Sequence, residues 1–212
     1  MVVLHHTAMQ TSAAAMARLC DPRAEVSAHY LIAESGEIVR LVSETRRAWH
    51  AGTGRWGQVR DVNSHSIGIE LANSGPLAGF PPFSAAQMDA LDELLSTILA
   101  RWQIPPERVI AHSDMAPARK ADPGPKFDWQ RLARQGLSVW PANPRPVSPD
   151  PALFRAACTS IGYDPEASPE TLLAAFRLRF LPGTTGALDG QSMARACDLA
   201  ARFPVDPNLG RP

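Results

Sequence analysis

The sequence predicts an α/β protein, with a mixed central β-sheet flanked by helices and a small three-helix domain after it. Short apolar runs rich in β-branched residues alternate with helical patterns through residues 1–140, an order typical of a sheet covered by helices. Five prolines lie within residues 141–151, and three further helical patterns follow them. The 212 residues are enough for one medium domain and one small one.

Five apolar segments are predicted to form the sheet. Each is a short run of mainly apolar residues bounded by polar or turn residues, and they occupy residues 2–4, 26–32, 37–42, 66–71 and 109–111. The second and third segments flank Ser35-Gly36, which is a hairpin signal. Residues 46–62 are rich in Gly and Trp without periodicity, so we expect a loop there.

Three helical patterns accompany these strands, at residues 12–20, 84–102 and 127–135. The middle one begins with a Ser-x-x-Gln capping box, in which Ser84 and Gln87 each bond the other's backbone N–H group. Its apolar residues recur at helical spacing and predict one buried face, formed by Met88, Leu91, Leu94, Leu95, Ile98 and Leu99.

The proline-rich stretch is predicted to divide the chain. Because proline fixes φ and lacks an N–H group, residues 141–150 should form an extended, stiff linker. We therefore predict one domain over residues 1–140, a second over residues 151–205, and a loose tail at residues 206–212. The helical patterns of the second domain cover residues 151–161, 168–180 and 190–203.

The composition excludes several classes of protein. Lys plus Arg and Asp plus Glu both number 21, so no basic surplus is available for nucleic acid or anionic lipid. No apolar run reaches the roughly 20 residues of a membrane-spanning helix. The three cysteines are odd in number and lack a Cys-x-x-Cys pair, so we expect buried reduced thiols rather than disulfides or a thiolate metal site. We expect a monomer.

The first residues already read as a strand, with no charged and apolar leader before them. A central strand at the very start is unusual, so we suspect that an N-terminal segment precedes this sequence. We expect a periplasmic protein if such a leader exists and a cytoplasmic one otherwise.

Three side chains carry the strongest chemical signal. His5 and His112 each end a predicted strand, and Asp122 follows His112 by ten residues on a loop long enough to fold back. Two imidazoles and one carboxylate can hold a divalent ion and leave one coordination position open, as in catalytic zinc sites. Water at that position has its pKa lowered toward ~7. The sequence therefore predicts a zinc hydrolase.

Two further residues complete the predicted chemistry. Glu70 lies within the apolar strand segment 66–71, where a carboxylate must face a polar site or carry a large desolvation cost. We expect it to act as the base that deprotonates the attacking water. Lys120, two residues before Asp122, could stabilise the developing oxyanion.

Five blocks at these positions resemble the type 2 N-acetylmuramoyl-L-alanine amidases, a zinc family that includes the AmpD-type recycling enzymes. The blocks occur in the family's order over about residues 1–140, and they are VLHHTA at 3–8, VSAHYLI at 26–32, AWHAG at 48–52, SIGIEL at 66–71 and KADPG at 120–124. Each block alone is a weak signal, whereas the set is specific. Residues 151–203 resemble, less strongly, a three-helix peptidoglycan-binding domain.

The resemblance implies hydrolysis of the amide between the lactyl group of N-acetylmuramic acid and L-alanine of the stem peptide. It implies Zn²⁺ as cofactor and peptidoglycan or a muropeptide as substrate. The implied metal ligands are His5, His112 and Asp122, with Glu70 and Lys120 as catalytic residues. Trp49 and His50 are implied to line the substrate groove, and Asn73, just after the Glu70 strand, is a further candidate for substrate contact.

Several alternatives stay open at this point. His6 competes with His5 for the metal, although strand alternation allows only one of them to reach it, and the motif favours His5. A recognition protein that binds muropeptide without cutting it is the main rival function, and a zinc hydrolase of another amide is the second. The sequence does not distinguish soluble 1,6-anhydro-muropeptides from polymeric sacculus as substrate.

Overall fold

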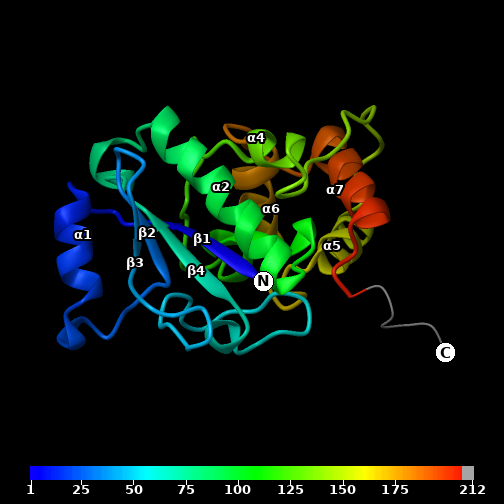
Figure 1. The fold of residues 1–212 in the computed structure, drawn as a ribbon. Helices are drawn as coiled ribbons and strands as arrows, with labels where there is room; N and C mark the ends of the chain where they lie inside the picture. Colours follow the sequence, from blue (N-terminus) through cyan, green and yellow to red (C-terminus); the bar gives the residue numbers. More distant parts are fainter. Residues whose placement is uncertain (207–212) are drawn as a thin grey trace.

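The computed structural model describes residues 1–206 and contains one five-stranded mixed sheet (Figure 1). The strand order is β3-β2-β4-β1-β5, with β1 at Val2–His6, β2 at Tyr30–Ile32, β3 at Ile38–Arg40, β4 at Ile67–Leu71 and β5 at Val109–Ala111. All neighbouring pairs are parallel except β2 and β3, which form an antiparallel hairpin. The predicted mixed sheet is confirmed.

One face of the sheet is covered by the helices α2 (Ala85–Trp102) and α4 (Trp129–Arg134). Val2 and Leu4 of β1 point to this face and pack against the apolar stripe of α2, which is buried at every predicted position except the partly buried Leu94. Ser84 caps α2 by accepting the Gln87 N–H. The second half of the predicted capping box is wrong, because the Gln87 amide instead donates to the carbonyls of Ile32 and Ala72.

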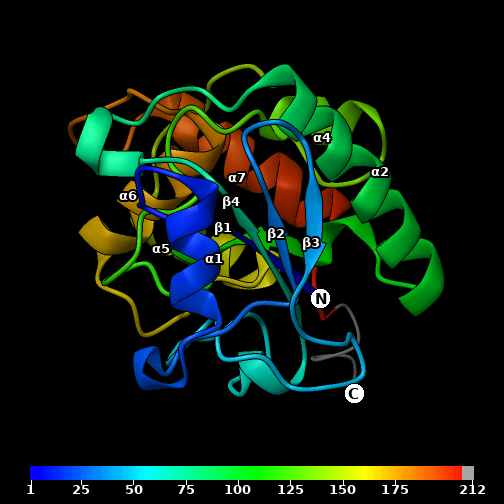
Figure 2. The ribbon, with the colours of Figure 1, turned by 60° about the vertical axis from the view of Figure 1, so that its left-hand side comes forward.

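The opposite face is shared between two sets of helices. The helix α1 (Ser12–Leu19) packs at the β2 end of this face through Ala15 and Leu31, and Figure 2 shows α1 and α2 on opposite sides of β2. The C-terminal helices cover the β1 and β5 end, where Val3 and Ile110 join their core. Strand alternation places His5 on this second face, between α1 and the C-terminal helices.

The C-terminal helices are α5 (Pro151–Ile161), α6 (Pro169–Phe180) and α7 (Gly190–Arg202). Each starts at a side chain that accepts backbone N–H groups, namely Asp150, Ser168 and Asp189. Residues 141–150 contain no helix or strand. The three helices lie together at the end of the molecule away from α1 (Figure 1), and their apolar residues form one continuous cluster with Val3, Ile110 and Met115. Within residues 1–206, no helix has the length and apolar character needed to cross a membrane.

Several predicted boundaries are wrong by a few residues. The strands predicted at 26–32 and 37–42 are only three residues each. The first of them starts late because the Ser27 N–H donates to the Trp49 carbonyl in the following loop instead of to a sheet strand. The helix α4 starts at Trp129 rather than at 127, since Asp128 caps it by accepting the Arg131 N–H. The tail predicted at residues 206–212 lies, beyond Asp206, outside the described residues.

Candidate active site

The sheet places His5 and Glu70 next to each other. The two residues are direct partners in the parallel β1–β4 register, so both side chains leave the same face at the carboxyl ends of their strands. The edge formed by the carboxyl ends of parallel strands is the usual location of ligand sites in α/β sheets. Gly68 lies two residues before Glu70, so a side chain there would leave the same face; its absence leaves room for the His50 ring.

The remaining two predicted ligands reach this edge from β5. The one-turn helix α3 (His112–Met115) follows β5 directly, so His112 stands at its first position. Asp122 returns to the same place on the loop after α3, and the Ser113 N–H donates to the Asp122 carbonyl at 3.0 Å. The turn that carries His112 therefore also fixes the backbone of Asp122.

The three side chains converge on one point. The Nδ1 atoms of His5 and His112 are 2.9 Å apart, and each is 3.0 Å from Asp122 Oδ2. Ligand atoms bonded at 2.0–2.1 Å to a tetrahedral ion would be about 3.3 Å apart. The observed spacing is only slightly tighter, and these residues form a group able to hold a metal ion.

Burial and hydrogen bonding set the protonation states that metal ligation requires. Burial, followed by the neighbouring His112, lowers the pKa of His5 to about 4. Burial alone would raise the pKa of Asp122, but the close contacts of its carboxylate with the His112 and His5 rings hold it well below its usual range. His5 is therefore neutral and Asp122 ionised at neutral pH, the forms in which both donate electron pairs to a metal.

A chain of hydrogen bonds behind His5 fixes which of its nitrogens faces the group. The Ser66 hydroxyl donates to the Val62 carbonyl, so it accepts from His50 Nε2 at 3.2 Å. The other nitrogen of His50, Nδ1, then accepts from His5 Nε2 at 3.0 Å. This order leaves the His5 Nδ1 lone pair directed at His112 and Asp122. Outer hydrogen bonds of this kind orient metal-binding imidazoles.

The second imidazole is oriented in the same way by the backbone. His112 Nε2 donates to the Ala51 carbonyl at 2.8 Å, which leaves its Nδ1 lone pair toward the group. Two residues hold the loop of Ala51 in place: Asn63 Oδ1 accepts the N–H groups of His50 and Ala51, and Arg119 donates to the Ala51 carbonyl. The sequence offered no local signal for Asn63 or Arg119, because both act on a loop without periodicity.

Gly68 makes the packing of His50 possible, and we expect Gly68→Ala to weaken metal binding about tenfold. An added Cβ would lie 2.3 Å from His50 Cγ, so the ring behind His5 would have to move. Chelator competition measures the effect. The control is Ile69→Val on the opposite face of β4, which should cost only about 1 kcal/mol of stability. Equal metal affinity in Gly68→Ala and in the unchanged protein would contradict this role of His50.

Glu70 and Lys120 lie beside the group but outside it. Burial raises the pKa of Glu70 to about 8, and the Asp122 carboxylate adds to the shift while Lys120 opposes it. Within residues 1–206, the buried Oε2 of Glu70 has no hydrogen-bond partner. Lys120 is exposed and lines the same cavity as Glu70. A carboxyl group with an unused oxygen and an exposed ammonium therefore lie beside the three converging residues.

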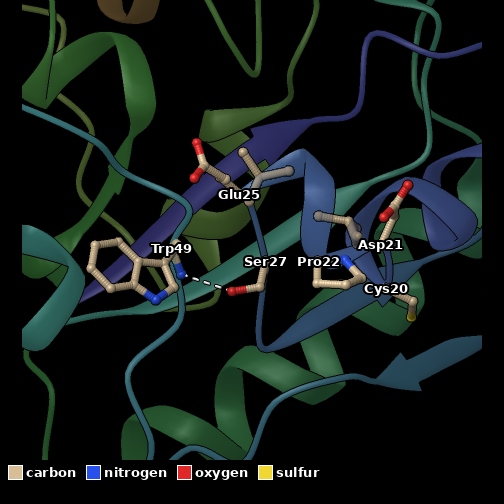
Figure 3. A pocket seen from close by; sticks show the side chains of 8 residues that line it. Cys20, Asp21, Pro22, Glu25, Ser27 and Trp49 are labelled. Carbon is tan, nitrogen blue, oxygen red and sulfur yellow. Dashed lines mark hydrogen bonds between the residues drawn. The ribbon is translucent and has the colours of Figure 1, made fainter.

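A cavity of about 280 Å³ opens over this site, with the three converging residues and Glu70 in its lining. Trp49 stands at its mouth with 57% of its surface exposed, and the Arg47 guanidinium lies 4.4 Å from the centre of its ring. A neighbouring cavity of about 610 Å³ shares Leu19, Val26, Ser27 and Trp49 with it. In Figure 3, the Trp49 backbone N–H donates to the Ser27 hydroxyl in this second cavity, and Cys20 lies on the opposite side of it.

Cys20 corrects one prediction. The three cysteines are unpaired and Cys158 is buried, but Cys20 is exposed and Cys197 partly so. Cys20 follows the last residue of α1, and its side chain reaches the wall of the second cavity rather than the core. The prediction of three buried thiols is therefore wrong for Cys20.

The other predicted residues lie around the cavity or outside it. His50 reaches its lining but uses both ring nitrogens on His5 and Ser66. The Asn73 side-chain amide forms its hydrogen bonds within its own loop. Its oxygen accepts from the Gly75 N–H, and its nitrogen donates to the Pro81 carbonyl. His6 is not part of the converging group, and its ring packs edge-on against Phe80.

Comparison with known proteins agrees with this arrangement. A family model described as N-acetylmuramoyl-L-alanine amidase matches residues 1–125. The chain is 38% identical to the N-acetylmuramoyl-L-alanine amidase AmiD of Escherichia coli strain K12, over 97% of this chain and 83% of that protein. It is 40% identical to the 1,6-anhydro-N-acetylmuramyl-L-alanine amidase AmpD of Enterobacter cloacae, over 50% of this chain and 55% of that protein.

Two solved structures are similar over nearly the whole chain. The complex of E. coli AmiD with anhydro-N-acetylmuramic acid-L-Ala-D-γ-Glu-L-Lys superposes with a TM-score of 0.86 at 37% identity, covering 96% of this chain and 89% of that chain. AmpDH3 of Pseudomonas aeruginosa in complex with an anhydromuramic pentapeptide gives a TM-score of 0.87 at 33% identity, covering 96% and 92%. Both similarities extend through the C-terminal helices.

Proposed function

The chain belongs to the N-acetylmuramoyl-L-alanine amidase family, and we propose that it hydrolyses the amide between the lactyl group of N-acetylmuramic acid and L-alanine. The convergence of His5, His112 and Asp122 next to Glu70 is the observation that carries this proposal. Anhydro-muropeptides are the first substrates to test, because the two similar proteins were captured with such molecules.

The metal we propose for this site is Zn²⁺, held by His5 Nδ1, His112 Nδ1 and Asp122 Oδ2. Imidazole nitrogens and a carboxylate oxygen suit a borderline ion, and three protein ligands leave one position open. Such an ion would supply Lewis acidity toward the substrate carbonyl and toward water. The hydrogen bonds of His50 and Ala51 keep both imidazoles aimed at the site.

Glu70 is the proposed base and acid of the reaction. In the ionised form, which a cation beside it would favour, its unpaired oxygen accepts a proton from the attacking water as hydroxide adds to the lactyl carbonyl carbon. When the carbon–nitrogen bond breaks, the same carboxyl passes that proton to the departing alanine nitrogen. Lys120 donates a hydrogen bond to the oxyanion between these steps. Trp49 provides an apolar wall at the cavity mouth, against which the substrate is bound.

We expect Lys120→Met to lower kcat roughly a hundredfold, the loss typical of removing one oxyanion donor. KM should change little, because the negative charge on the carbonyl oxygen exists only in the transition state. The matched control is Lys126→Met, which removes an exposed lysine of the same loop whose amine donates to the Gly79 carbonyl. Equal kcat values for the two variants would exclude Lys120 from this role.

A direct test is digestion of anhydro-muropeptide and of intact sacculus, with the products identified by mass spectrometry. The proposal predicts release of the free stem peptide, loss of that activity with a chelator, and recovery on addition of zinc. Tight binding of the muropeptide without cleavage by the zinc-loaded protein would instead indicate a recognition protein. Cleavage at another amide would indicate a different hydrolase.

A further inference from the structure

We infer that the C-terminal helices position the metal-ligand turn α3, through a buried contact of Tyr163 and Arg179 with Asp114. This makes Tyr163 and Arg179 positioning residues of the active site, in addition to any contact of residues 151–205 with the cell wall. The inference rests on the proposed metal site. It concerns residues that are 49 and 65 positions away from Asp114 in the chain.

Asp114 determines where the turn that carries His112 begins. Its Oδ2 accepts the Ala111 N–H at 2.8 Å, so the carboxylate closes the backbone at the junction of β5 and α3. The next amide of the turn, Ser113 N–H, bonds the Asp122 carbonyl. A shift of this turn would therefore displace His112 and Asp122 together.

The C-terminal helices supply the other partners of that carboxylate. The Tyr163 hydroxyl, which follows α5, donates to Asp114 Oδ1 at 2.7 Å. Arg179 on α6 donates through Nη1 to Asp114 Oδ2. The second guanidinium nitrogen of Arg179 donates to the Val109 carbonyl on β5 at 3.1 Å and to Ser138 Oγ at 2.9 Å. One guanidinium thus joins α6 to the strand and to the turn.

The contact is fully enclosed. Asp114 is 0% exposed, Tyr163 1% and Arg179 2%. The Arg179 guanidinium also stacks over the Trp129 ring at 4.1 Å. Burying a charge pair carries a large desolvation penalty, which only well-aligned hydrogen bonds offset. These bonds hold the C-terminal helices against the ligand turn in one geometry.

The backbone around Tyr163 is shaped to place this hydroxyl. Gly162 adopts φ +126, and a Cβ there would lie 2.5 Å from the Trp56 ring. Trp56 in turn packs edge-on against Tyr163, with ring centres 5.1 Å apart. The loop of residues 46–62 and the C-terminal helices therefore hold the tyrosine from both sides.

The test is Tyr163→Phe in the full chain, which removes one oxygen and keeps the ring. We expect zinc affinity, measured by chelator competition, to fall about threefold to tenfold. This is less than the roughly 10- to 100-fold typical of residues that touch a ligand directly, because Tyr163 acts through Asp114. At zinc concentrations that saturate the unchanged protein, kcat should fall while KM stays within about twofold.

The control is Leu199→Val, which trims a fully buried side chain on α7 in the same apolar cluster. It should lower the melting temperature about as much as Tyr163→Phe does, but it should leave zinc affinity unchanged. If Tyr163→Phe and Leu199→Val have equal zinc affinities, the contact is structural only and the inference is wrong. If the unchanged protein binds no zinc, the proposed function fails first. If it binds zinc without cleaving muropeptide, only the proposed amidase activity is wrong.

Discussion

Replacing Glu70 by Gln should lower kcat roughly a hundred- to ten-thousand-fold, the range that general acid–base catalysis supplies. The amide has nearly the same shape as the carboxylate but cannot take up a proton from water or return it to the leaving nitrogen. Metal content should stay the same, because Glu70 lies outside the converging group. Steady-state kinetics with an anhydro-muropeptide, together with metal analysis of the purified protein, measure both quantities.

The control for this variant is Glu37→Gln, which changes an exposed carboxylate near β3. It should leave kcat unchanged. Glu70→Gln should also be at least as stable as the unchanged protein at pH 9. Burial raises the pKa of Glu70 to about 8, so above that pH the fold must hold a buried negative charge that glutamine lacks. Retention of full activity by Glu70→Gln would remove this residue from the mechanism.

Asp122→Ala should abolish activity and weaken zinc binding by more than about a hundredfold, beyond the loss expected for residues behind the ligands. The change removes the only anionic donor of the group and leaves His5 and His112 facing each other across 2.9 Å. Either imidazole would then have to turn away or accept a proton. Chelator competition and a zinc titration of activity measure the two losses.

Asp89→Ala is the matched control, because Asp89 is an exposed carboxylate that pairs with Arg131 on the surface. Surface pairs of this kind contribute at most about 1 kcal/mol, so zinc affinity and activity should stay unchanged. Recovery of activity by Asp122→Ala at high zinc would still agree with ligation. Unaltered zinc affinity in Asp122→Ala would contradict it.

The sequence was sufficient for the parts of the fold that depend on local pattern. The strands ending at His5 and at His112 were predicted from short apolar runs, and parallel neighbours necessarily end at the same edge of a sheet. The structure accordingly brings together side chains that are 107 positions apart. Donor chemistry and the family resemblance together therefore predict the converging group, and the resemblance selects His5 over His6.

The parts that sequence reasoning missed depend on contacts without a local pattern. His50 lies behind His5 because the loop of residues 46–62 folds under β4, and nothing in that irregular stretch indicates its path. The Gln87 side chain donates to the carbonyl of Ile32, at the end of β2, and to that of Ala72, just after β4, instead of bonding its own helix end. The bond between Arg179 and Asp114 joins a helix of the C-terminal unit to the ligand turn, which a reading of separate domains cannot anticipate.

Zinc ligation by His5, His112 and Asp122 is tested most directly by anomalous diffraction from crystals of the zinc-loaded protein, recorded on both sides of the zinc edge. Zinc held by the proposed ligands should give one strong peak, about 2.0–2.1 Å from His5 Nδ1, His112 Nδ1 and an oxygen of Asp122. A peak bonded to other residues, or crystals that take up no zinc at these three side chains, would contradict it.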